Sequence, residues 1–161
     1  MQNNETIGRN CLALILTGMF FLAGCVSPPP PLAAIADADA KSFVAKDDVG
    51  RVYVYDNVAP INTRNFPVVI DTQIAGHLGK GCYMMVDLKP GNYTISSVGG
   101  SHNPEFDLSV QAGSIYFLKQ CQNWSWGNSG GGGGARYEKS SPEDGKKEVL
   151  KRKRVPAKFR Q

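Results

Sequence analysis

The sequence predicts an all-β domain, an antiparallel β-sandwich that is followed by a short C-terminal helix. Short segments rich in β-branched and aromatic residues alternate with turn signals about every ten residues, which is typical of a sandwich. The segment 105–111 alternates apolar and polar side chains, so Phe106, Leu108 and Val110 are expected on one buried face.

The remaining strands follow from the same signals. Residues 51–55 are β-branched and aromatic and come after a turn at 47–50. Pro90 and Gly91 supply turn chemistry, which predicts a hairpin between the segments on either side. We expect further strands at 67–71, 73–78, 82–87, 93–98, 114–120 and 135–139.

A helix is predicted to begin at Ser141. Ser141 is a suitable cap, Pro142 fits the first turn, and the acids Glu143 and Asp144 suit the positive end of the helix dipole. Gly145 weakens this helix, and Pro156 is expected to end it.

A short apolar run near the N-terminus ends in Leu22-Ala23-Gly24-Cys25. The run, 11–23, has thirteen residues, which suits a signal peptide, whereas a membrane-spanning helix needs about 20. The tetrapeptide resembles a bacterial lipobox. This resemblance implies cleavage between Gly24 and Cys25 and a lipid on Cys25, which makes the membrane the first expected partner.

The residue after the cysteine is Val26 rather than Asp, which favours the outer membrane, with the domain facing the periplasm. We therefore divide the chain into a signal peptide at 1–24, a lipidated cysteine and Pro/Ala-rich tether at 25–40, a sandwich at 41–139, and a short helix with a basic tail at 140–161.

The basic character of the chain belongs to its tail. Residues 146–161 contain eight basic side chains and one acid, whereas residues 25–145 contain nine basic and twelve acidic side chains. The domain itself is therefore slightly acidic, and we expect no nucleic-acid partner.

The sequence shows no recognisable catalytic, metal or cofactor site. His77 and His102 lie in no Ser or Cys nucleophile motif and have no zinc-ligand spacing. The glycine-rich stretches lack the Lys-Ser/Thr of a phosphate loop. We expect no enzyme and no cofactor, although carboxylates that meet only in space would leave an envelope hydrolase as an alternative.

Cys82 and Cys121 remain once Cys11 and Cys25 are set aside. In an oxidising periplasm two leftover cysteines most often form a disulfide, so a bridge is expected. The alternative is two separate buried thiols.

Two surface features are candidates for binding. Trp124 and Trp126 are two residues apart, so in an extended segment they share a side and could stack on sugar rings, unless they cap the sandwich. The run Lys151-Arg152-Lys153-Arg154 is either an anionic-surface contact or a solvated tail.

Four segments resemble a family of small bacterial lipoproteins that is catalogued as a domain of unknown function, number twenty-eight forty-six. They are Gly50-Arg51-Val52-Tyr53-Val54-Tyr55, Val69-Ile70-Asp71, Leu88-Lys89-Pro90-Gly91-Asn92-Tyr93 and Gly113-Ser114-Ile115-Tyr116-Phe117. The third pattern also recurs in transthyretin-like modules, which implies a transthyretin- or immunoglobulin-like sandwich. The family brings no catalytic residues.

These observations predict a membrane-anchored periplasmic lipoprotein with a non-catalytic sandwich that binds or scaffolds at the cell envelope. A protein partner is expected, because lipid attachment raises the effective concentration of even weak contacts. The alternative is peptidoglycan or envelope-polysaccharide binding through Trp124 and Trp126.

Overall fold

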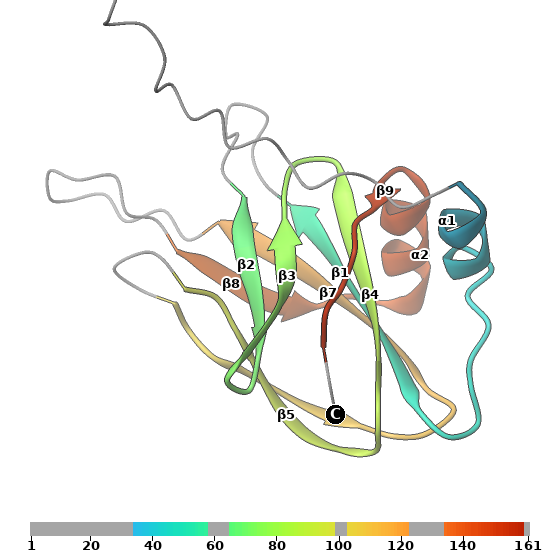
Figure 1. The fold of residues 1–161 in the computed structure, drawn as a ribbon, viewed down its shortest axis with the longest axis horizontal. Coiled ribbons are helices and arrows are strands. Elements are labelled where there is room, and N and C mark those ends of the chain that lie inside the picture. The colour runs from blue at the N-terminus through green and yellow to red at the C-terminus, as the bar shows by residue number, and fades with distance from the viewer. Residues whose placement is uncertain (1–33, 58–64, 99–102, 123–133, 160–161) are drawn as a thin grey trace, which may run out of the picture.

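The computed structural model describes residues 34–57, 65–98, 103–122 and 134–159, and within them the chain forms two facing sheets (Figure 1). The five-stranded sheet has the order β8 (Ala135–Lys139), β7 (Ile115–Gln122), β1 (Gly50–Asn57), β4 (Cys82–Leu88), β9 (Lys153–Arg154). The four-stranded sheet has the order β3 (Gln73–Leu78), β2 (Phe66–Ile70), β5 (Gly91–Ser96), β6 (Phe106–Val110). Two helices, α1 (Ala34–Ala40) and α2 (Pro142–Leu150), complete the described part.

The predicted all-β sandwich with a C-terminal helix is confirmed, with one refinement. The four-stranded sheet is antiparallel, but in the five-stranded sheet β1 runs parallel to β7 and β4 runs parallel to β9. The five-stranded sheet is therefore mixed.

The strands expected at 67–71 and 73–78 form a hairpin, whereas the hairpin predicted at Pro90 and Gly91 is wrong. β2 and β3 join through Asp71-Thr72, where Asp71 adopts a φ of +54° and its carboxylate accepts a hydrogen bond from the Thr94 amide at 2.9 Å. The turn before Gly91 instead carries the chain from β4 in one sheet to β5 in the other. Pro-Gly chemistry reverses the chain, but it does not decide which sheet the next strand joins.

The main core lies between the two sheets. In β6 the predicted alternation holds, because Leu108 and Val110 are buried while Asp107 and Ser109 are exposed. The core side chains come from strands of both sheets and from one residue after β9; they include Val52, Val54, Val68, Ile70, Leu78, Met84, Leu88, Ile95, Leu118 and Val155.

The outer face of the five-stranded sheet is also buried. Seven consecutive residues of β1, 50–56, are shielded from solvent. On the outer face Tyr53 stacks on Phe117 with ring centroids 5.1 Å apart, and Ala40 and Val149 complete a second apolar cluster. Both helices therefore lie over this face, as Figure 1 shows.

Helix α2 begins where the sequence predicts. The Ser141 side chain accepts a hydrogen bond from the Asp144 amide at 3.1 Å, and Pro142 follows the cap. Gly145, which weakens the helix by propensity, is buried so closely against Phe117 that an added Cβ would overlap the ring. The glycine therefore allows the helix to approach the sheet.

The predicted tether at 25–40 extends too far, because α1 forms inside it. Ala40 is 1% exposed, and the Asp37 carboxylate pairs with the Lys41 ammonium at 2.8 Å. The Ala/Asp stretch shows no apolar face in sequence, so the helix depends on contacts with the sheet rather than on its own propensity.

The predicted basic tail is also part of the folded domain. Lys153 and Arg154 form β9, the Val155 side chain is 1% exposed in the core, and the Lys158 amide donates to the Ala75 carbonyl at 2.6 Å. We call residues 153–159 the closing segment, because they run from the edge of β4 to the edge of β3 and join the two sheets on that side.

Candidate functional site

A hollow of about 500 Å³ lies where β7 emerges from the turn after β6. Its walls come from β6, β7, the end of β8 and the start of α2. The lining residues are Ser109, Gln111, Ser114, Ile115, Tyr116, Phe117, Lys139, Ser140 and Pro142.

The floor of the hollow is an uncovered part of the β7 edge. β8 pairs with β7 only over Leu118 to Gln122. The Arg51 amide donates to the Ser114 carbonyl at 2.8 Å, and in a parallel ladder this bond turns the N–H and C=O of Ile115 away from β1. Within the described part of the chain, those two groups face the hollow without a neighbouring strand.

Side chains from both faces of the sheet flank this edge. On the core side, the Lys139 ammonium lies 5.6 Å from the centroid of the Tyr116 ring. On the helix side, Phe117 and Pro142 form the wall, and the Ser140 amide donates to the Phe117 carbonyl at 2.8 Å. The lining holds one cation, Lys139, and no carboxylate.

The second candidate surface is the end of the sandwich where α1 begins, which we call the anchor end. Here Asp37 is the central acceptor: the Tyr83 hydroxyl donates to it at 2.7 Å and the Lys41 ammonium at 2.8 Å. Burial raises the pKa of Asp37, but these donors outweigh burial and hold the pKa below its usual value. Burial and the same hydrogen bond raise the pKa of Tyr83.

Arginine side chains join α1 and α2 to the sheet at the anchor end. The Arg152 guanidinium bonds the Asp56 carboxylate at 2.7 Å and lies 5.0 Å from the centroid of the Tyr55 ring. Arg154 donates to the Ala36 carbonyl at 2.8 Å. The start of the folded chain is thus held directly by residues near 152–154.

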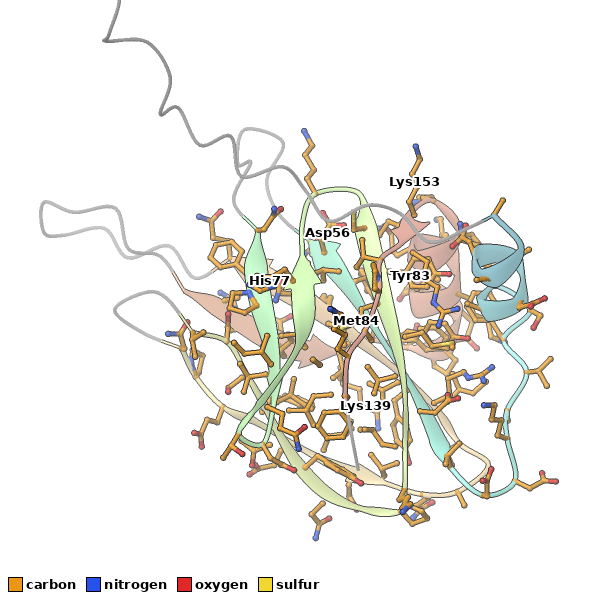
Figure 2. All side chains as sticks on the ribbon, viewed as in Figure 1. Asp56, His77, Tyr83, Met84, Lys139 and Lys153 are labelled. Atoms are coloured by element: carbon orange, nitrogen blue, oxygen red, sulfur yellow. The ribbon has the colours of Figure 1, made fainter. Side chains whose placement is uncertain are left out.

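The predicted basic surface therefore separates into two pairs. Arg152 and Arg154 are half-buried and serve internal contacts, whereas Lys151 and Lys153 are exposed. Figure 2 shows Lys153 projecting from the anchor end.

The expected disulfide is absent, and Cys82 and Cys121 are free thiols. They lie on β4 and β7, with β1 between them. Two strand spacings separate their backbones by about 9.6 Å, beyond the range of roughly 4.4–6.8 Å that a disulfide needs. Burial, followed by the nearby Asp56 charge, raises the pKa of Cys82, which disfavours a reactive thiolate.

Several predicted site residues lie outside the described part of the chain: Gly24 and Cys25 of the lipobox, and Trp124 and Trp126. Of the two histidines, His77 is exposed on β3 and His102 lies outside the described residues. Within the described ranges, no cluster of His, Cys, Asp or Glu could hold a metal, and no helix is long and apolar enough to cross a membrane.

Two carboxyl groups on the outer side of the five-stranded sheet, Asp37 and Asp87, have lowered pKa values and form structural ion pairs. Burial acts against the Asp87 charge, but the Arg51 and Lys46 hydrogen bonds outweigh it and lower the pKa of Asp87. Like Asp37, Asp87 is thus an ionised partner of a cation rather than a poised acid. Neither carboxylate lines the hollow.

Sequence reasoning missed the hollow, although one signal was present. The predicted strand at 114–120 is longer than its predicted neighbour at 135–139, and Ser141-Pro142 forces the chain into a helix. The start of the longer strand must therefore lack a partner on that side, if the two strands pair. The partner assignment itself was not evident from the sequence.

The comparison with known proteins matches residues 46–135, more than half of the chain, to the family described as "Protein of unknown function (DUF2846)". No curated protein and no solved structure matches the chain. The match begins shortly before β1 and ends at the first residue of β8, so both helices and β9 lie outside it. The chain belongs to the DUF2846 family of proteins of unknown function.

Proposed function

We propose that this protein is a lipid-anchored periplasmic lipoprotein of the outer membrane, and that its non-catalytic sandwich recruits another envelope protein. Recruitment occurs by strand addition: an extended segment of the partner pairs with the free edge of β7 at Ile115. The observation that carries the proposal is the uncovered edge within the hollow.

The hollow has the features that strand addition requires. Main-chain donors and acceptors at an open edge supply affinity, and side-chain walls on either side of the edge select the partner. The N–H and C=O of Ile115 form the edge, and Tyr116 and Phe117 supply rings on opposite sides. Lys139 favours a partner segment with an acidic group next to the paired residues.

The anchor rests on the sequence Leu22-Ala23-Gly24-Cys25 and is consistent with the contacts of α1. A domain that hangs from its N-terminus needs its first folded residues held firmly. Asp37 and Ala36 are bonded to Tyr83 and Arg154, which belong to the sheet. Lipid attachment would then concentrate weak strand addition at the membrane.

The recruitment site is tested by a photo-crosslinking residue placed at Ser109, which lines the hollow, or at Asn92 as the matched control. Asn92 pairs with Ser109 on the neighbouring strand and is exposed, but it does not line the hollow. In cells we expect Ser109 to yield one protein adduct that Asn92 does not yield. The same adduct from both positions, or none from Ser109, would contradict the site.

Two variants show whether the adduct depends on the edge. Ile115→Pro removes the N–H that faces the hollow without removing a bond to β1, and Lys139→Glu reverses the charge. Both should abolish the adduct while circular dichroism confirms a folded domain. An adduct that persists in both variants rules out strand addition there.

The anchor is tested separately by labelling cells with a palmitate analogue. Label on the protein that disappears in Cys25→Ala, together with loss from the membrane fraction, supports lipidation. Label that survives in Cys25→Ala rejects Cys25 as the attachment site.

The alternative, peptidoglycan or polysaccharide binding, is favoured by the spacing of Trp124 and Trp126. The unlipidated chain from Ser27 is sedimented with purified sacculi at two salt concentrations. Saturable, salt-resistant pelleting that is lost in Trp124→Ala/Trp126→Ala would support wall binding, and no pelleting would reject it.

A further inference from the structure

The anchor end carries a small basic surface formed by Lys151 and Lys153. Both side chains are exposed, and Lys80 is exposed on the turn that bonds β9, where the Lys153 amide donates to the Gly81 carbonyl at 3.0 Å. This surface therefore joins the end of α2, β9 and the β3–β4 turn.

Three of the nearby carboxylates are already paired, whereas Asp39 on α1 is exposed. Asp37 bonds Lys41, Asp56 bonds Arg152, and Glu148 bonds both Arg152 and Lys151. Lys153 has no ion-pair partner in the described part of the chain, so the anchor end presents excess positive charge. The Lys153 charge is therefore not neutralised by an internal ion pair, whereas Lys151 shares Glu148 with Arg152.

The opposite end of the sandwich has a different charge. β1 begins there after the exposed acids Asp47 and Asp48, while Lys46 and Arg51 are both paired with Asp87. From Arg51 to Asp56, β1 spans about 16 Å between the two ends. With the exposed Lys89 of the β4–β5 turn included, the charged residues of this end balance, so an anionic membrane surface would attract the anchor end more strongly than the opposite end.

The start of α1 lies at the basic end, because Arg154 holds Ala36 there. Ten residues lie between Cys25 and Ala36, and this length of chain spans at most about 40 Å. The basic end is thus the part of the domain closest along the chain to the expected lipid.

We propose that the basic surface of the anchor end docks on anionic phospholipid headgroups and fixes the orientation of the domain on its membrane. Lys151 and Lys153 make the contact, and Arg152 and Arg154 hold the surface in place from within. The hollow, which begins at the other end of β7, then faces away from the bilayer. This orientation rests on the proposed lipid anchor, whereas the attraction to anionic lipid does not.

The test is lysine acetylation of the mature lipidated protein in vesicles, read by mass spectrometry. One set of vesicles is pure phosphatidylcholine, and the other is a mixture of phosphatidylcholine and the anionic lipid phosphatidylglycerol. Lys89, exposed in the β4–β5 turn, is the internal control for the far end. We expect the acetylation rates of Lys151 and Lys153 to fall severalfold relative to Lys89 in the anionic vesicles, with recovery in high salt.

A ratio of Lys153 to Lys89 acetylation rates that is the same in both kinds of vesicle would overturn the proposal. So would protection of Lys89 alone, because that would reverse the orientation. Flotation of the protein with pure phosphatidylcholine vesicles tests the lipid anchor independently of the acetylation rates.

A second measurement separates attraction from anchoring. The full mature chain carrying Cys25→Ser is floated with anionic vesicles, and Lys151→Gln/Lys153→Gln should weaken its binding about tenfold. Lys89→Gln/Lys158→Gln removes the same charge elsewhere and should change binding less than twofold. Equal losses in the two double variants would reduce the effect to net charge and overturn a localised surface.

Discussion

The sandwich has two sides where the edges of its sheets approach each other, and the chain covers these two sides to different extents. On one side the closing segment pairs with β4 and bonds β3, with Val155 buried between the sheets. On the other side β8 stops at Lys139, and the edge of β7 at Ile115 is left in a hollow. The chain thus covers one edge with its own residues and leaves part of the other available for pairing.

The difference shows why a charged run need not lie in solvent. Lys153 and Arg154 contribute through their backbones to β9, while the Arg152 guanidinium reaches Asp56. Their long side chains extend past the strand to water or to partners, so charge and structural burial coexist in one segment.

The largest effect is expected from opening the closed side. Truncation after Arg152 removes the buried Val155 side chain and the backbone bonds to Gly81, Tyr83 and Ala75. We expect a loss of at least about 3 kcal/mol in the free energy of unfolding, measured by urea denaturation. Lys153→Ala keeps the backbone and should cost less than about 0.5 kcal/mol. An unchanged urea midpoint in the truncated chain would show that the closing segment is not part of the stable core.

A smaller effect is expected at Gly145, where α2 meets the covered face of the same sheet. Gly145→Ala should raise helix propensity by about 1 kcal/mol, yet its Cβ would overlap Phe117. We expect net destabilisation of about 1–3 kcal/mol, seen as a lower thermal midpoint. Lys147→Ala on the same helix is exposed and serves as the control. Stabilisation by Gly145→Ala would mean that the helix is not closely packed.

The Asp37 carboxylate gives the covered face a pH dependence. Its pKa is lowered in the folded state, so its contribution is present above the unfolded pKa of about 3.9 and is lost as pH falls through the lower folded value. Asp37→Asn should cost about 1 kcal/mol at neutral pH and much less at pH 2. Urea midpoints across this range check it, with the exposed Asp39→Asn as control. The same loss of unfolding free energy at both pH values would mean that Asp37→Asn acts through packing rather than through the carboxylate charge.

The open side should tolerate change with little loss of stability. Lys139→Ala removes an exposed ammonium that lies over the Tyr116 ring, and it should change the free energy of unfolding by less than about 0.5 kcal/mol. A loss above about 1.5 kcal/mol would make Lys139 part of the core rather than of a binding surface.

The smallest effect is expected from a reductant, because Cys82 and Cys121 form no disulfide that it could break. Such a bridge would have to link β4 to β7 across β1. The thiols are free, so dithiothreitol should leave the thermal midpoint unchanged. A bridge would contribute about 3–4 kcal/mol, and its reduction would be evident. Alkylation under denaturing conditions counts the free thiols directly.

The sequence predicts individual strands better than it predicts their partners. β6 alternates because one of its faces is wet, and that pattern is readable from the chain. The outer tyrosines of β1 require cover, but no local pattern identifies α1 and α2 as that cover. Register and sheet membership depend on contacts distant in sequence, which explains why the turn before Gly91 was misassigned.

The candidate site was predictable to a smaller degree. The basic run was visible, but the division between internal arginines and exposed lysines follows from Asp56 and Ala36, which lie about a hundred residues away. The hollow depends on where β8 ends relative to β7, a register that the sequence does not specify.

The parallel pairing of β1 with β7 also governs when this chain can fold. Arg51 in β1 can pair only after Ile115 has been made, and the side covered by the closing segment is complete only when Val155 is present. A chain emerging from a translocation channel would therefore stay incomplete until residues this late in the sequence have passed through. If the protein is exported unfolded, as the proposed anchor requires, the aromatic strands would stay without their cover until those residues arrive.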